Sequence, residues 1–257
     1  MFYKRFKEYG VKQESLSSCY AMAETTFAVT QTPPDKEAKI LYVKKQSIAK
    51  GVIELNGNDE NSRTCVSSGK TIDGCKVRIV DDKENDLPES YVGEIVISSV
   101  SLFDGYRNYP EKTAIALKDG WYYSGDYGFC LNGEYYVIGR KKDIIIVAGN
   151  NVYPEDVEDL VNHVEGVIPG RVVAFGEDDE DLGSEQISVV AETKISDEAE
   201  HKKLKLEIIK ACMVYDFNIK KVYLVPPRWM IKSSAGKPSR KANRERLVDK
   251  REIIKWS

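Results

Sequence analysis

The sequence is poor in histidine, and its cysteines suit neither a disulfide framework nor a zinc site. There are 2 histidines, His163 and His201, and 5 cysteines that are scattered and never form a CxxC pair. A histidine-based metal site and a Ser-His-Asp triad are therefore disfavoured. The cysteines are expected to be the reduced thiols of a cytoplasmic protein.

Long apolar runs are also absent. The longest is Ile144 to Ala148, far shorter than the ~20 residues that a membrane-spanning helix needs. The first residues, MFYKRFKEYG, lack the apolar segment of a secretory signal peptide. We therefore expect no transmembrane segment, no secretion and a cytoplasmic location.

A charge excess of one sign is likewise missing from the chain as a whole. The 257 residues carry 38 Lys and Arg against 41 Asp and Glu, a net charge of −3. This balance argues against nucleic acid as a partner, because nucleic-acid-binding domains are usually basic. Locally the charge is uneven: residues 220–255 hold 12 basic and 3 acidic side chains. This basic tail is either a solvated face or a segment that handles an anion such as phosphate.

What is present is the composition of a folded protein, with 42% hydrophobic and 31% charged residues. Residues 1–60 show no clear period, and residues 44–62 look like a surface excursion rich in turn residues. From residue 65 to 140 the pattern favours short β-strands joined by tight turns, which predicts a small antiparallel barrel or meander. The expected strands are 77–80, 93–97, 121–123 and 135–138.

The pattern changes again after Arg140. A buried-type strand at 143–147 precedes Pro154, which suits the first turn of a helix. Apolar residues then follow at helical spacing, and the order of elements becomes α-β-β-α-β, which is typical of a two-layer α+β domain. The expected strands are 171–175, 187–191 and 222–225, and the expected second helix is 204–212.

Two stretches resemble phosphate-binding P-loops, and neither qualifies. In Ser67–Thr71 the required upstream glycine is replaced by Thr64, and a strand follows where a helix is needed. The stretch Ser233–Lys237 has no GxxxxGK[ST] pattern either. Taken alone, Lys237 is more readily explained as a solvated lysine of the basic tail.

Three other residues each allow two interpretations when taken alone. Asp126, in Ser-Gly-Asp-Tyr-Gly, could accept hydrogen bonds from a ribose diol or could cap its own turn. Glu24 could bind a hard cation or could be a surface glutamate. Arg140 could contribute to a site or could belong to a charged linker.

The order of these signals is more specific than any one of them. The chain resembles the adenylate-forming superfamily, which includes acyl-CoA synthetases, fatty acyl-AMP ligases, peptide-synthetase adenylation domains and luciferases. Four motifs occur in family order along nearly the whole chain. They are Tyr20-Ala21-Met22-Ala23-Glu24 (YGxTE), Tyr123-Ser124-Gly125-Asp126 (the TGD motif), Gly139–Asp143 with Gly149–Glu158 (the hinge motif and the loop and helix after it) and Ser234–Lys237 (SGK).

The resemblance implies a role for each matching residue. Tyr20 would stack on adenine, Glu24 would bind magnesium, and Asp126 would bind the ribose hydroxyls beside Arg140. Lys142 would be the hinge about which a C-terminal lid rotates, and Lys237 would contact the acyl carboxylate and the α-phosphate. A cation and a lysine suit this chemistry because they offset the repulsion between two reacting anions. The residues expected to line the approach of the thiol are Gly149, Asn150, Asn151 and Tyr153.

Departures from the family pattern are equally informative. Ala23 stands where the superfamily often has threonine, which removes one hydroxyl contact to phosphate, although Ala23 remains in the expected nucleotide site. Nothing in the chain matches the phosphate loop SSGTTGxPK, which lies upstream of the tyrosine motif in the family. The acyl-pocket walls that precede this motif are missing too, so neither the acyl chain nor the choice of CoA or carrier protein follows from the sequence.

We therefore expect an α+β chain that forms the C-terminal part of an ATP-dependent acyl-adenylating, acid–thiol ligase. Residues 1–64 would end a large α/β subdomain, 65–140 would form a small antiparallel β-barrel subdomain, and 141–257 would form a two-layer α+β lid. The substrates would be a fatty or other carboxylic acid, ATP with magnesium, and the thiol of CoA or of a carrier protein's phosphopantetheine. The chain alone is expected to be inactive. Three alternatives remain. The chain could be half of a split enzyme that needs the missing N-terminal half, a non-catalytic interaction module, or an independent AMP-binding protein.

Overall fold

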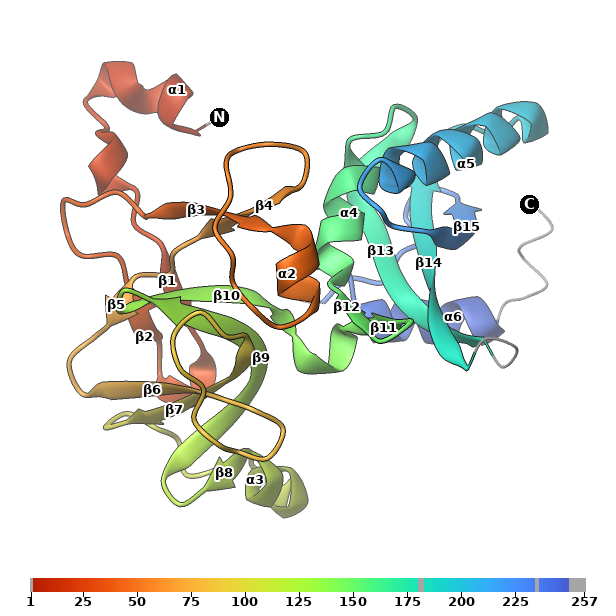
Figure 1. Cartoon of the computed structure of the whole chain (residues 1–257). Coiled ribbons are helices and arrows are strands. Elements are labelled where there is room, and N and C mark those ends of the chain that lie inside the picture. Colours follow the sequence, from red (N-terminus) through yellow and green to blue (C-terminus); the bar gives the residue numbers. More distant parts are fainter. Residues whose placement is uncertain (1, 180–182, 234–235, 250–257) are drawn as a thin grey trace. The chain divides into compact units, whose positions relative to one another are not determined.

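The computed structural model describes residues 2–179, 183–233 and 236–249 (Figure 1). The chain divides into two compact units, unit 1 over Met1–Lys142 and unit 2 over Asp143–Ser257. Both units combine helices with sheets, so the expected α+β fold class is confirmed. The finer division at residues 64 and 140 stays a prediction.

Unit 1 is built around a five-stranded antiparallel sheet. Its strands follow the order β10-β9-β7-β6, and the short strand β8 pairs with β9. The sheet is curled, and β10 and β6 are the two ends of this path, so it forms a half-barrel and not a closed barrel. Strand β9 bends strongly (Figure 1). The strands are β6 (Cys75–Val80), β7 (Gly93–Ser99), β8 (Leu117–Lys118), β9 (Trp121–Leu131) and β10 (Glu134–Arg140). All four predicted strands are present, and β9 is longer than expected.

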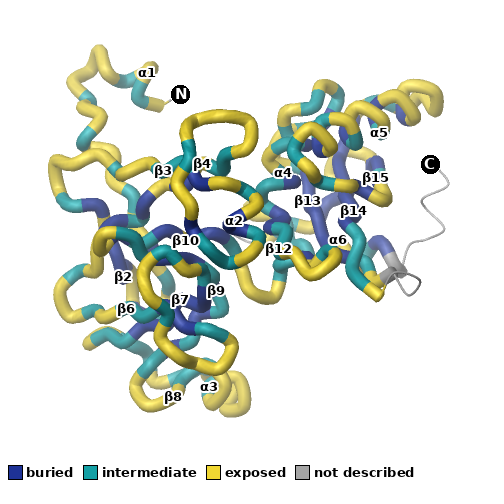
Figure 2. The backbone as a smooth tube through the Cα atoms, in the orientation of Figure 1, coloured by how far each residue is buried: buried dark blue, intermediate teal, exposed yellow. Residues whose placement is uncertain are grey.

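The core of this sheet includes consecutive residues of β7, so this strand is buried on both of its faces. Val96 and Ile97 of β7 and Phe129 of β9 are fully buried. The ring of Phe129 stacks on that of Tyr136 in β10, with centroids 4.7 Å apart and an interplanar angle of 6°. These strands form the dark, buried centre of unit 1 in Figure 2.

The first seventy residues form two smaller sheets beside the half-barrel. One has the order β1-β2-β5 and the other is the hairpin β3-β4. The elements are α1 (Phe2–Phe6), η1 (Lys7–Tyr9), η2 (Gln13–Ser15), β1 (Cys19–Ala21), η3 (Ala23–Thr25), β2 (Ala28–Gln31), β3 (Ile40–Lys44), α2 (Lys45–Ala49), β4 (Ser62–Val66) and β5 (Lys70–Thr71), with α3 (Pro110–Ala116) later in the unit. The surface excursion expected at 44–62 is only partly right. Ile48 of α2 and Ile53 are buried, because isolated apolar residues in this polar segment anchor it to the unit.

Unit 2 is a three-stranded sheet with helices on it. The strands follow the order β13-β14-β15, and β14 and β15 are parallel, joined through α5. The elements are η4 (Lys141–Asp143), which spans the boundary of the units, then β11 (Ile145–Val147), β12 (Asn150–Val152), α4 (Pro154–Asn162), β13 (Val167–Asp179), β14 (Ser184–Thr193), α5 (Glu198–Met213), β15 (Ile219–Val225) and α6 (Arg240–Asp249). The predicted order α-β-β-α-β is confirmed from α4 to β15.

The two faces of this sheet bury different sets of side chains. Val157 of α4 and Ile208 of α5 pack with Val189 on one face. Val190, the next residue along β14, packs on the other face with Trp229 and α6. Alternation along β14 therefore serves both layers of core. Helix α6 was not expected, because its sequence is dominated by charged residues and gives little apolar period.

Candidate functional site

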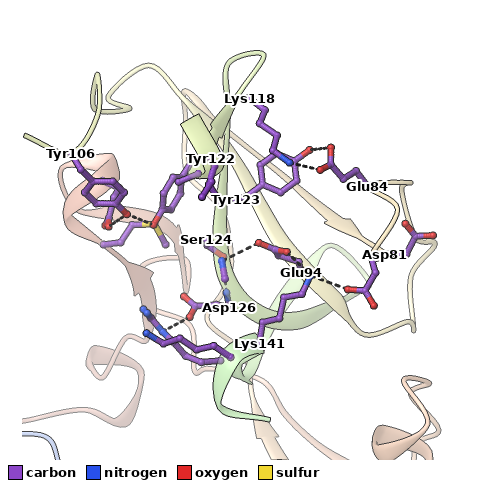
Figure 3. Close-up of a pocket in the computed structure, with 18 of the residues that line it drawn as sticks. Asp81, Glu84, Glu94, Tyr106, Lys118, Tyr122, Tyr123, Ser124, Asp126 and Lys141 are labelled. Atoms are coloured by element: carbon purple, nitrogen blue, oxygen red, sulfur yellow. Dashed lines mark hydrogen bonds and ion pairs between the residues drawn. The ribbon is translucent and has the colours of Figure 1, made fainter. Parts of the chain in front are cut away.

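A cavity of about 560 Å³ opens on unit 1 (Figure 3). The segments that line it include residues 21–24 around η3, the acidic loop after β6, the strand β9, and the end of β10 with the lysines after it. Glu94 of β7, Tyr106 and residues of α3 and β8 complete the lining. Three of the four sequence motifs thus contribute to a single cavity. Glu24, Asp126, Arg140 and Lys142 are among its lining residues.

Asp126, of the TGD motif, contacts one residue of the tyrosine motif and one residue of the hinge motif. The hydroxyl of Tyr20 donates a hydrogen bond to Oδ2 of Asp126 over 2.6 Å. Nε of Arg140 lies 2.8 Å from Oδ1, since Arg140 is the cross-strand partner of Asp126 in the β9–β10 ladder. Tyr20 and Asp126 are 106 residues apart in sequence, and the fold brings their polar groups into direct contact.

Burial shapes the electrostatics of this group. Asp126 is 7% exposed, and burial raises the pKa of its carboxyl, while the hydrogen bond from Tyr20 and the charge of Arg140 oppose that rise. Burial, followed by the nearby Asp126, raises the pKa of the Tyr20 hydroxyl well above its ordinary value. Tyr20 is therefore a neutral donor, and the carboxylate of Asp126 keeps acceptor capacity for further donors.

Tyr20 and Ala23 occupy different surroundings from those that their predicted roles suggest. The ring of Tyr20 belongs to the buried core with Val29 and Ile95, and the cavity is lined beside it by Ala21 and Met22. Ala23 is exposed at the start of η3. Adenine stacking on Tyr20 and a phosphate contact near Ala23 stay predictions.

Glu24 faces the cavity together with two tyrosines that the sequence analysis did not identify. The hydroxyl of Tyr106 donates to Oε1 of Glu24 over 2.8 Å, and the hydroxyls of Tyr106 and Tyr122 are 3.2 Å apart. No sequence signal connected Tyr106 with Glu24, because they are 82 residues apart and Tyr106 lies in a loop outside the strand pattern.

A second polar group, also missed, surrounds Lys141. Its Nζ lies 2.9 Å from Oδ1 of Asp82 and 3.2 Å from Oε2 of Glu94. Burial lowers the pKa of this ammonium, but the bonds to the two carboxylates outweigh it and raise the pKa overall. Glu94 also accepts the backbone N–H of Gly125 over 3.1 Å. Lys141 therefore fixes the end of β10 to β7 and to the acidic loop.

Lys142 and the residues expected at the thiol approach lie around the start of unit 2. Lys142 is exposed and is the last residue of unit 1. Hairpin β11–β12 turns at Ala148 and Gly149, which have φ values of 48° and 79°, a two-residue turn that favours glycine. Asn150 is exposed and Asn151 half-buried, whereas Tyr153 is buried at the N-cap of α4.

Lys237 lies in a turn of unit 2. Its carbonyl accepts the N–H of Ser233 over 2.8 Å, and Lys232 forms a β-bridge with Pro238. The Lys237 side chain is exposed, while Ser234 and Ala235 of the same motif lie outside the described residues. The turn leads into α6, where Arg240 binds Glu158 through two nitrogens at 2.6 and 2.7 Å.

The donor chemistry of the cavity is compatible with magnesium. Over the described ranges, no group of three or more His, Cys, Asp or Glu is arranged to hold a metal. Magnesium is usually held by one or two carboxylates together with substrate phosphates, and Glu24 supplies one such carboxylate.

In the same described ranges, no helix is both long and apolar enough to span a bilayer.

Comparison with known proteins gives relatives of one kind. Residues 2–107 match the family model described as AMP-binding enzyme. A long-chain-fatty-acid–AMP ligase of Mycobacterium marinum is 27% identical over 96% of this chain and 46% of its own length. A putative acyl-CoA ligase of Bacillus subtilis is 40% identical over 42% of this chain and 22% of its own length.

Solved structures agree with the sequence relatives. A chain from work on fatty acyl-adenylate ligases of E. coli and L. pneumophila superposes with a TM-score of 0.85 and 26% identity, covering 98% of this chain and 45% of that one. The present chain thus spans less than half the length of these relatives. By its sequence and its fold, the chain belongs to the adenylate-forming superfamily of AMP-binding enzymes.

Proposed function

We propose that this chain forms the C-terminal part of an ATP-dependent acyl-adenylating ligase. The reaction would join a fatty or other carboxylic acid to ATP, giving acyl-AMP and pyrophosphate. The acyl group would then pass to the thiol of CoA or of a carrier protein's phosphopantetheine. The proposal rests on the family membership and on one observation, the contact of Tyr20, Asp126 and Arg140 beside a cavity.

The cavity would hold the nucleoside part of ATP. In this proposal Asp126 accepts hydrogen bonds from both ribose hydroxyls, because an ionised carboxylate is an acceptor with room for four donors and has two partners here. Arg140 keeps the carboxylate ionised and oriented. Tyr20 would contact the adenine, and Ala23 would lie near the phosphates.

Charge neutralisation would come from a cation and a lysine. Magnesium, when bound through Glu24, would offset the charge of the phosphates. The ammonium of Lys237 would contact the carboxylate of the acid and the α-phosphate, so that two anions can approach each other. The exposed side chain of Lys237 on a short turn supports this role, because the ammonium is available to a ligand.

The second half-reaction would need a change in the lid. We propose that residues 1–64 and 65–140 act as parts of the nucleotide-binding body and that residues 141–257 act as the lid, with Lys142 as the hinge. Gly149, Asn150, Asn151 and Tyr153 would then line the approach of the thiol. The boundary of the compact units at Lys142 and Asp143 supports this assignment.

The 257 residues contain no match to the SSGTTGxPK loop. We therefore propose that adenylation requires this loop from outside these residues, either in the same polypeptide or in a partner chain. The test is acid-dependent exchange of pyrophosphate into ATP. It would be measured for the 257-residue chain and for the chain joined to the loop-bearing half of a fatty acyl-AMP ligase.

The expected result is exchange in the joined protein and none in the chain alone. A joined protein that folds and binds ATP but shows no exchange with any fatty acid would contradict the proposed reaction. Exchange by the 257 residues alone would contradict the requirement for the loop. Calorimetric binding of AMP by the chain alone, without exchange, would favour a nucleotide-binding role.

A further inference from the structure

The loop of residues 103–106 holds Glu24 from two directions. The N–H of Phe103 donates to the backbone carbonyl of Glu24 over 2.8 Å. The hydroxyl of Tyr106 donates to the side-chain Oε1 of Glu24 over 2.8 Å. Both the backbone and the carboxylate of Glu24 are thus fixed by one short segment from a distant part of the sequence.

The direction of the hydrogen bonds follows from the number of hydrogens. An ionised carboxylate only accepts, so Tyr106 must give its single hydroxyl hydrogen to Glu24. Tyr122, whose hydroxyl lies 3.2 Å away, must then be the donor to Tyr106. Each bond in such a chain polarises the next and strengthens it. In Figure 3 the labelled rings of Tyr106 and Tyr122 meet at one end of the cavity.

The position of Tyr106 is itself determined by close packing. Its N–H donates to Oγ1 of Thr113 over 2.9 Å. Gly105 has a φ of 149°, and a Cβ there would lie 2.6 Å from Cγ2 of Thr113, so only glycine allows this approach. The ring of Phe103 meets that of Tyr106 edge-on, with centroids 4.9 Å apart. These contacts restrict the rotamers available to Tyr106.

We propose that Tyr106, supported by Tyr122, is a positioning residue that orients the carboxylate of Glu24 toward a divalent cation in the cavity. The inference rests on the proposed function, in which Glu24 binds magnesium. Carboxylates that bind metals are themselves commonly oriented by hydrogen bonds, and loss of such a partner typically weakens metal binding about 10- to 100-fold. Tyr106 would thus act on the metal through Glu24 and would not touch it.

The test uses Mn²⁺ as the probe and the 257-residue chain with excess ATP. Paramagnetic broadening of the amide signals of Met22 and Phe103, which flank Glu24, gives the Mn²⁺ midpoint. Tyr106→Phe removes only the hydroxyl. Tyr123→Phe is the matched control, because the Tyr123 hydroxyl also donates to a carboxylate at this cavity, Glu84, over 3.1 Å. Glu24→Gln removes the ligand itself.

We expect Tyr106→Phe to raise the Mn²⁺ midpoint about tenfold, with ATP affinity in the absence of metal unchanged. The control should bind Mn²⁺ as the wild type does. The double variant with Glu24→Gln should be no weaker than Glu24→Gln alone, because the two residues act as one unit. If Tyr106→Phe fails to fold, Tyr122→Phe tests the same chain of hydrogen bonds, with a smaller rise expected.

Two negative outcomes are distinguishable. Saturable broadening that is equal in the wild type and in Tyr106→Phe, or additive effects in the double variant, would overturn the positioning role alone. No saturable broadening beside Glu24 in the wild type would overturn the metal role of Glu24 in the proposed function, and the positioning role with it.

Discussion

Asp126 and Arg140 face each other across strands β9 and β10, and Nε of Arg140 lies 2.8 Å from Oδ1 of Asp126. The arginine side chain is about half exposed, whereas the aspartate is nearly covered. The strand ladder therefore sets the position of the carboxylate, and the arginine compensates its charge from the solvent side. This pair is the basis of the first two predictions.

Asp126→Asn should remove the recognition of ribose hydroxyls. The amide keeps the size of the side chain but loses the negative charge and one acceptor oxygen. The wild-type chain, joined to the loop-bearing half, should bind AMP more tightly than 2′,3′-dideoxy-AMP. The variant should lose most of that preference, as measured by calorimetry with both ligands. A variant that still prefers AMP to the same extent would exclude Asp126 as the ribose partner.

The same substitution should change how stability depends on pH. The folded-state pKa of Asp126 is raised, so the folded chain holds this proton more tightly than the unfolded chain does. The associated stability is complete below the ordinary value of about 4 and is lost as pH rises through the folded pKa. Urea unfolding between about pH 4 and pH 7 should therefore show the stability of the Asn variant rising, relative to that of the wild type, as the pH increases. A constant difference over that range would contradict the raised pKa.

Lys237→Ala should separate the two half-reactions of the joined protein. Loss of the ammonium removes charge compensation at the step where two anions meet, so pyrophosphate exchange should fall by at least about 100-fold, in the range seen for loss of one electrostatic stabiliser. Transfer from preformed acyl-AMP to a thiol should be spared. The matched control is Lys232→Ala, which removes another lysine beside the same turn. Equal loss of both half-reactions would contradict the assigned role.

Arg240→Met should destabilise unit 2. Arg240 contacts the carboxylates of Asp143, Glu155 and Glu158, and its side chain is 18% exposed. Removing one partner of a buried ion pair typically costs about 3–5 kcal/mol, so a loss of about 3 kcal/mol in the free energy of unfolding is expected. Urea unfolding followed by the amide signals of β14 measures it.

Lys241→Met is the control for that measurement, because its side chain is 88% exposed and its ion pair with Glu245 is long at 3.8 Å. It should change the unfolding free energy by less than about 0.5 kcal/mol. If Arg240→Met proves equally neutral, the carboxylates around it do not depend on its charge for stability.

The sequence predicted the elements whose periodicity is strong and local. Strands β6, β7 and β10 and helices α4 and α5 all carry apolar residues at the spacing of their class, and all are present. Helix α6 was missed because it is held by polar contacts with a segment outside the helix, and not by an apolar stripe of its own. Asn243, fully buried, bonds to both backbone groups of Ile231, and this pairing leaves no apolar period in the sequence.

Part of the cavity lining was predictable from the motifs, although the roles assigned to its residues stay predictions. Asp126, Arg140 and Glu24 were identified, and all three line one cavity. Tyr106 and Glu94 were missed because each acts through a long-range hydrogen bond to a motif residue. Such bonds depend on loop geometry, which residue spacing along one chain does not encode.

The residues on either side of Lys142 are held within different units. Lys141 is bonded to Asp82 and Glu94 of unit 1, and Asp143 is bonded to Arg240 of unit 2. Lys142 lies between these two ion-paired residues, within η4. A change in the backbone angles of this one residue would leave the ion pairs of both neighbours within their own units.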